Sequence, residues 1–386
     1  MGFRLSVVLV AVAAPLGAQT YADLTTVRGR PSAWGQVLQV RAGVLGSLAG
    51  EEDPAIGLDD EIGWDGHVYY RQQRFADRQA TLDAYAGRDG AYLGVSEGEL
   101  VGQDTQSRLE LTVRYFPFYR EGFYRDGDFV PTGRYEGLDY GAQLTFAREL
   151  SEGLRMEFGP FFRRMTFDRN EDTPVNYVTP DDFSAYGVRA FLEHGTLVLD
   201  RVTGRPRDGF VLTLVGEREQ NDASRRFGTV GIFETDLPSG LWRGRGHLEW
   251  YYQQSSLATW GLRVDGQISD EKDRVYNYDA QKPQGHLWVD GQLGLRLDFG
   301  QALAVEPFAQ LQFLRIVDEA GLGTDQETFF GGGVNARFDF GDGLSLVGEY
   351  SFLENESRPP VSVTDDTFGE HRFFFGLEVR FAGQRN

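Results

Sequence analysis

The strict alternation of apolar and polar residues between His286 and Phe299 constrains the fold of this chain more than any other feature. In HLWVDGQLGLRLDF the odd-numbered positions carry Leu, Val, Gly or Phe, and the even-numbered ones carry mostly polar residues. This pattern indicates a strand with one apolar and one polar face. Strands usually have about 5–6 residues. A two-faced strand of more than twice that length therefore predicts a wall between hydrocarbon and water.

Similar alternation recurs along the chain and predicts an all-β protein. We expect strands at residues 36–45, 64–75, 78–88, 91–101, 106–116, 136–148, 153–167, 183–199, from 210 onward, 241–253, 257–269, 285–299, 302–315, 328–340, 344–353 and 371–381. Residues 225–237 are either a further strand or part of a loop. As a loop they leave 16 strands and keep all long connections on one side, so we predict 16, with 14 or 18 as alternatives.

The connections alternate in length, as expected of a transmembrane antiparallel β-barrel with short periplasmic turns and long outer loops. Long polar connections are predicted at 117–134, 168–181, 270–284, 316–327 and 354–369. A soluble sandwich rarely keeps alternation for so long in one strand, and a solenoid would show a short internal repeat, which the sequence lacks. Only closed barrels satisfy every backbone group of strands in lipid.

The N-terminus predicts export. Arg4 precedes an apolar run from Leu5 to Ala14, the pattern of a secretory signal peptide with cleavage after Ala18. An anchor helix would need roughly 20 apolar residues, which Pro15 interrupts. We expect residues 1–18 to be a signal peptide, 19–33 a short periplasmic segment and 34–386 a barrel in the outer membrane of a Gram-negative bacterium.

Charge and cysteine content limit the function. The chain has no Cys, and its 38 Lys and Arg against 58 Asp and Glu give a net charge of −20. Zero cysteines exclude disulfides and thiolate chemistry, and the negative charge argues against nucleic-acid binding. We expect no cofactor and no metal. The expected partners are outer-membrane lipid and, during insertion, the barrel-assembly machinery, and the sequence does not identify a client protein or solute.

The polar face of the predicted strands carries a series of basic residues. If the odd–even phase is maintained, the lumen holds Arg243, Arg245, His247, Arg263, Arg296, Arg337 and Arg380, with acidic residues between them. One interpretation is a hydrated interior whose charges pair with each other. The other is a selective pore whose arginines pass anionic solutes.

The histidines do not predict an enzyme. His67, His194, His247, His286 and His371 lie in no hydrolase or zinc-protease motif. His67 and His371 are predicted near loop ends, so an outer-leaflet lipid hydrolase is the least favoured hypothesis. Asp59 to Glu61 and Asp365 to Asp366 lack calcium-loop spacing and indicate solvated acidic loops.

Residues 197–216, LVLDRVTGRPRDGFVLTLVG, resemble the barrel of the bacterial surface-antigen family that includes BamA and TamA. In that family a strand ends in Asp, and a turn with Pro and Gly leads to the next strand; Asp200, Pro206 and Gly209 stand in those places. The resemblance implies a 16-strand barrel that aids insertion or translocation of protein or lipid. A porin or solute channel with a charged lumen is the alternative.

The resemblance extends to residues 225–252, which look like the family's next hairpin and favour a strand at 225–237. Two features depart from the family pattern. No central loop carries its Val-Arg-Gly-Phe-like motif, and residues 19–33 leave no room for periplasmic repeat domains. The last strand, with Phe373, Phe375 and Phe381, resembles the C-terminal assembly signal of outer-membrane proteins, although Ala382 to Asn386 extend beyond it.

Overall fold

The computed structural model describes most of the chain between residues 35 and 383. The described ranges are 35–49, 61–75, 80–87, 90–98, 105–125, 128–169, 173–200, 203–223, 225–231, 233–270, 287–317, 324–341, 343–353 and 370–383. The predicted signal peptide, the segment 19–33 and the acidic residues 59–60 and 365–366 lie outside them. Among the described residues, no helix is long and apolar enough to cross a membrane.

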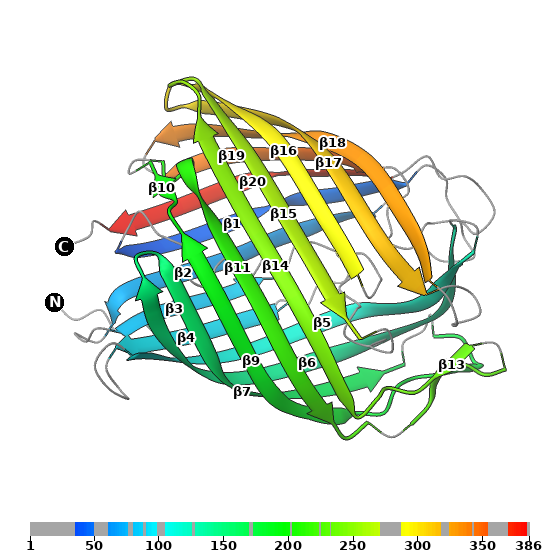
Figure 1. Ribbon diagram of the computed structural model, residues 1–386. Coiled ribbons are helices and arrows are strands. Elements are labelled where there is room, and N and C mark those ends of the chain that lie inside the picture. Colours follow the sequence, from blue (N-terminus) through cyan, green and yellow to red (C-terminus); the bar gives the residue numbers. More distant parts are fainter. Residues whose placement is uncertain are drawn as a thin grey trace.

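Sixteen strands form one closed antiparallel barrel (Figure 1), which confirms the predicted fold class and strand number. The strands are β1 (Gln36–Ala49), β2 (Glu61–Phe75), β3 (Ala80–Gly87), β4 (Gly90–Gly98), β5 (Thr105–Arg125), β6 (Asp128–Ser151), β7 (Leu154–Asp168), β9 (Phe183–Gly195), β11 (Pro206–Asn221), β14 (Gly240–Gln253), β15 (Ala258–Ser269), β16 (Leu287–Phe299), β17 (Leu303–Val317), β18 (Thr324–Gly341), β19 (Leu344–Leu353) and β20 (Glu370–Gly383).

The seam between the first and last strands is continuously paired. β1 and β20 run antiparallel from Gln36↔Gly383 to Ala49↔Glu370 without a register shift. The start of β1 and the end of β20 therefore lie at the same end of the barrel, as Figure 1 shows for the two strands. We call this the periplasmic end and the opposite one the loop end.

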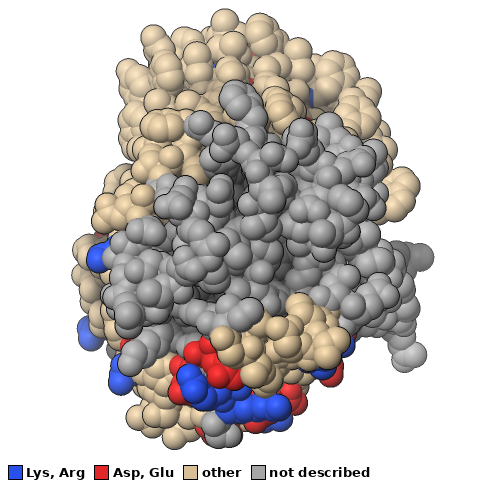
Figure 2. Space-filling view, turned by 90° about the vertical axis from the view of Figure 1, so that its right-hand side faces the viewer, with Lys and Arg blue, Asp and Glu red and all other residues tan. Residues whose placement is uncertain are grey.

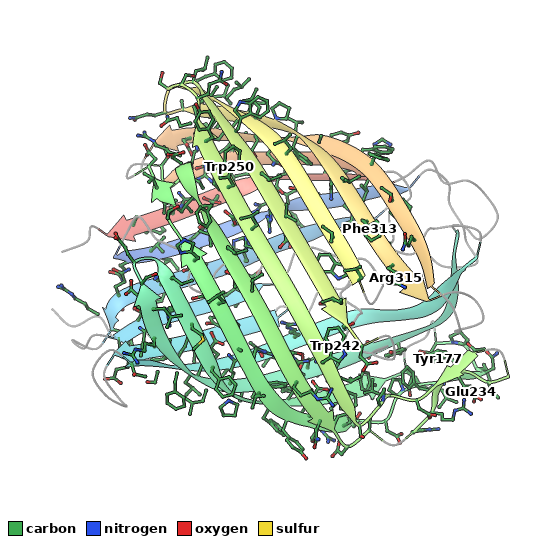
Figure 3. All side chains as sticks on the ribbon, in the orientation of Figure 1. Tyr177, Glu234, Trp242, Trp250, Phe313 and Arg315 are labelled. Atoms are coloured by element: carbon green, nitrogen blue, oxygen red, sulfur yellow. The ribbon has the colours of Figure 1, made fainter. Side chains whose placement is uncertain are left out.

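The alternation seen in the sequence separates the two faces of the wall. On β16, Leu293 and Phe299 point outward, with 47% and 50% of their surface exposed, while Trp288 and Arg296 are buried on the inner side. Trp242 and Trp250 lie near opposite ends of β14 (Figure 3) and are both exposed. Their separation of eight residues corresponds to roughly 20 Å across a bilayer for a tilted strand. The outer surface thus resembles an apolar band with aromatic borders.

The wall is unequal in height on the side of β2 to β6. β3 and β4 have only 8 and 9 residues, whereas β5 and β6 have 21 and 24. The prediction of a loop at 117–134 is wrong, because β5 and β6 continue as a hairpin to Arg125 and Asp128. The register shifts after Phe116 and after Glu121. Such bulges insert unpaired residues and break the period-two pattern. The extension of β5 and β6 therefore could not be predicted from alternation in the sequence.

Residues 225–237 lie outside the barrel wall, as predicted for a loop. Within this segment β12 (Phe227–Thr229) and β13 (Phe233–Thr235) form a short hairpin, and β12 also pairs with β8 (Tyr177–Val178). Phe227 and Tyr177 are buried in a cluster with Tyr135, Phe183 and Leu241. This packing attaches the small sheet to the loop end of the barrel. Viewed from that end, charged side chains of both signs gather at the lower edge (Figure 2).

The strand predicted at 183–199 is interrupted. β9 ends at Gly195, and Val198–Leu199 form a separate short strand, β10, which pairs with the start of β11. The interruption accommodates a turn in which Gly204 and Gly209 have positive φ angles of 70° and 91°. A side chain at Gly209 would also meet the carbonyl oxygen of Thr196, 2.3 Å from an ideal Cβ. Glycine is therefore required there for both conformation and space.

Candidate functional site in the barrel lumen

A largely buried group of charges in the lumen centres on Glu217 of β11. Its carboxylate accepts hydrogen bonds from Arg189 Nε at 2.8 Å and from the guanidinium of Arg243. Arg243 also donates to Glu219 at 3.0 Å, and Arg189 donates to Gln143. The register explains these pairs, because Glu217 lies directly opposite Arg189 on β9 and Arg243 on β14. We call these four charged residues the Glu217 network.

A second group of charges joins β14 and β15. His247 contacts Asp265 through Nδ1 at 2.7 Å and Glu249 through Nε2 at 3.1 Å. Arg263 Nε lies 3.0 Å from Asp265, and the hydroxyl of Tyr251 donates to Glu249 at 3.1 Å. A histidine held between two carboxylates is an ordinary structural element of a polar wall.

The turn that carries Asp200, Pro206 and Gly209 does not remain at the rim of the barrel. We call residues 196–200 and 203–209 the strap. Asp200 organises it locally by accepting hydrogen bonds from the backbone N–H and the hydroxyl of Thr203, at 2.7 and 3.0 Å. Arg207 binds the same carboxylate. The strap is therefore a defined turn, of the kind that Asp side chains stabilise.

Arg205 connects the strap to the opposite part of the wall. Its guanidinium binds Asp298 at 2.8 Å and Asp339 at 2.6 Å. The carbonyl of Thr203 accepts a hydrogen bond from Arg380 of β20 at 2.8 Å. Seven inter-strand pairings separate β11 from β20 in a wall of 16 strands. The strap thus crosses the periplasmic end of the lumen.

The arginines predicted on β16, β18 and β20 meet around the strap. Arg296 lies 3.0 Å from Asp298 and donates to the carbonyl of Pro206 at 2.7 Å. Arg337 and Arg380 share Glu378, at 2.8 and 2.7 Å. Distant parts of the sequence are joined here because all three strands end at the same rim.

A recess opens on the lumen beside the Glu217 network. Its polar lining includes Arg114, Arg163, Arg189 and Arg245, and its apolar lining includes Phe161 and Phe191. Of the predicted lumen residues only Arg245 lines it. We call it the arginine recess.

Several residues of these groups were not among the predicted lumen residues. Glu217, Glu219, Arg163 and Arg189 follow the same alternating phase as the predicted residues, which is the signal that could have found them. Arg108 was likewise not singled out as a site residue. It is buried and binds Glu110 and the hydroxyl of Tyr92, both at 2.8 Å.

The described histidines lie apart from one another. His67 is next to Tyr85, with ring centroids 5.5 Å apart. His194 lies 3.0 Å from the carbonyl of Gly153, and His371 lies 2.8 Å from the hydroxyl of Tyr350. His286 is outside the described residues. Among the residues that the structure describes, no group of three His, Asp or Glu side chains is arranged to hold a metal. That the chain is not an enzyme stays a prediction.

The last strand presents its phenylalanines to the outside. Phe375 and Phe381 have 58% and 59% of their surface exposed, and Phe373 lies on the same face of β20. β20 continues beyond Phe381 to Gly383. Their role in assembly stays a prediction.

The barrel, its apolar band and its charged interior together define a protein of the outer-membrane β-barrel class. No protein-family model and no curated protein matches the sequence. Solved structures with the same fold are BamA from Haemophilus ducreyi lacking POTRA domains 1–3 (TM-score 0.56, 11% identity, 90% of this chain and 70% of that chain) and CdiB from Acinetobacter baumannii (TM-score 0.53, 12% identity, 89% and 60%). CdiB from Escherichia coli is also similar (TM-score 0.50, 11% identity, 90% and 63%).

These likenesses confirm the expected resemblance to BamA-type barrels as a resemblance of fold. The chain spans 60% and 63% of the length of the two CdiB structures. Identities of this size are informative about the fold alone.

Proposed function

We propose that this protein is an outer-membrane channel that lets small charged solutes pass through a hydrated lumen. The continuous pairing of β1 with β20 is the observation that carries the proposal. A barrel that releases a client sideways between its terminal strands must break that pairing and expose two strand edges. A closed wall with a charged interior instead favours transport along the axis, and barrels of 16 strands are wide enough for an aqueous channel.

The seam can be tested with a disulfide. Val40 and Val379 are register partners across the seam, and the chain has no other cysteine, so Val40→Cys with Val379→Cys allows a single cross-link. We expect the oxidised protein in planar bilayers to keep its single-channel conductance within about 10% of the reduced protein, because axial flow needs no separation of these strands. A current lost on oxidation and restored by reductant would contradict the proposal.

The strap narrows the periplasmic end of the proposed channel. Arg205→Gln removes the two ion pairs that hold the strap against β16 and β18. We expect the single-channel conductance to rise roughly 1.5- to 2-fold, because a strap held only by the hydrogen bonds from Arg296 and Arg380 is looser and blocks less of the lumen.

Arg207→Gln is the matched control for this prediction. Arg207 lies in the same strap and binds Asp200 within it, so the charge change is identical while the cross-lumen contacts remain. Equal conductance in wild type and the Arg205 variant would show that the strap does not restrict flow.

Insertion of protein or lipid is the second candidate, and the low wall at β3 and β4 favours it. β3 pairs with β2 only from His67 onward, and β4 pairs with β5 only as far as Arg114. Near the loop end, β2 and β5 therefore each have one edge without a strand partner among the described residues. The likeness to BamA and CdiB is compatible with this function.

A vesicle assay separates the two candidates. If the low wall is an exit, vesicles that carry this barrel should speed the insertion of a urea-denatured eight-strand barrel, and the seam disulfide should not change that rate. If the protein is instead a channel, we expect the eight-strand barrel to insert no faster than it does into vesicles that carry a porin of similar size.

A further inference from the structure

The arginine recess contains more positive charge than its acidic residues neutralise. Arg114, Arg163, Arg189 and Arg245 line it together with Glu110, Asp139 and Glu217. Two of these carboxylates are also engaged by arginines that do not line the recess. Glu110 binds Arg108 at 2.8 Å, and Glu217 accepts a bond from Arg243 as well as from Arg189.

Arg245 is the residue that this arrangement leaves without a partner. Its cross-strand neighbours are Val215 on β11 and Gln267 on β15, so no carboxylate faces it in the register. Among the described residues its guanidinium makes no hydrogen bond or ion pair, and its Nε is buried without a partner. A buried guanidinium N–H without a hydrogen-bond acceptor is unfavourable, and an anion bound in the recess would relieve that cost.

Aromatic rings complete the recess beside the arginines. Phe161 is 5% exposed, and the guanidiniums of Arg189 and Arg163 lie 4.7 and 5.7 Å from the centre of its ring. Phe191 is also 5% exposed and lines the same space. The recess is open on the side of the lumen, so a solute can reach these rings and arginines. The recess thus offers a guanidinium for an anionic head and an apolar wall for the body that carries it.

We infer that the arginine recess is a binding site for a small organic carboxylate with a flat apolar body. Arg245 receives the carboxylate, for which the planar guanidinium fork is suited, and Phe161 with Phe191 contacts the body. Inorganic anions can pair with the guanidinium but make no favourable apolar contact with the rings. This inference deepens the proposed channel function and rests on it, because it names the class of solute that the channel would select.

Benzoate is the probe for this site. In isothermal titration calorimetry of the folded barrel in detergent, we expect saturable benzoate binding that is weakened about tenfold in Arg245→Gln, the usual effect of losing a charge-assisted hydrogen bond. Phe191→Leu should weaken benzoate and leave inorganic phosphate unchanged. Arg148→Gln, which removes the same charge at an exposed position near the periplasmic end of β6, should bind like wild type.

Should Arg245→Gln fail to fold, Arg245→Lys retains the charge without the fork and is expected to lose about threefold. If the heats of benzoate binding are identical in wild type and the Arg245 variants, the proposed binding site is refuted. Phosphate binding as tightly as benzoate, with no effect of Phe191→Leu, would also overturn it.

Conductance distinguishes failure of the site from failure of the channel. A barrel that binds benzoate through Arg245 but carries no current removes the channel proposal and leaves the site. A conducting barrel without saturable benzoate binding removes the site alone.

Discussion

Replacing Glu217 with Gln is expected to reduce the free energy of unfolding by about 3 kcal/mol, because it leaves the buried Arg243 and the half-buried Arg189 without their common counter-charge. Glu217 contacts both Arg189 and Arg243. Arg243 has Glu219 as a remaining acid at 3.0 Å, whereas Arg189 retains, within the described part of the chain, only the amide oxygen of Gln143. The loss is measured as a lower midpoint of urea-induced unfolding in detergent, with the slope unchanged.

Glu152→Gln is the control for this effect. Glu152 lies exposed in the turn between β6 and β7, so the variant removes the same charge without breaking a buried pair, and surface changes usually stay within about 0.5 kcal/mol. If both variants unfold at the wild-type midpoint, the Glu217 network is hydrated enough to tolerate the loss, and its stabilising role is refuted.

Placing an arginine on the outer face of β16 is expected to have an effect of similar size. Leu293 is the central residue of this strand and has 47% of its surface exposed. Leu293→Arg puts a charge at the middle of the apolar band, where it costs about 2–4 kcal/mol. The measurement is the yield and urea midpoint of folding into lipid vesicles.

The adjacent residue tests whether the effect depends on the face of the strand. Gln292 points toward the lumen, opposite Arg263 and Gln310 in the register. Gln292→Arg adds the same side chain to the polar face and should cost less than about 1 kcal/mol. Equal losses in the two variants would show that β16 does not separate lipid from water.

Most of the wall could be predicted from the sequence because alternation is a local property of each strand. The period-two pattern predicts two neighbouring strands at 285–299 and 302–315, and the structure has them at Leu287–Phe299 and Leu303–Val317. If all long loops lie on one side of the membrane, the number of strands is even. This condition predicted that residues 225–237 lie outside the wall, although the family resemblance favoured a strand there. The extension of β5 and β6 was missed because bulges near Pro117 and Pro131 disrupt the alternation.

The sequence by itself therefore determined the fold class and the number of strands, because alternation within each strand is enough to predict a barrel wall. It did not determine which charges meet. Glu217 binds arginines on two neighbouring strands, and Arg205 reaches Asp298 and Asp339 across the barrel. The first depends on the register between strands and the second on closure of the wall. Neither is encoded in a local pattern, and the same register leaves Arg245 facing Val215 and Gln267.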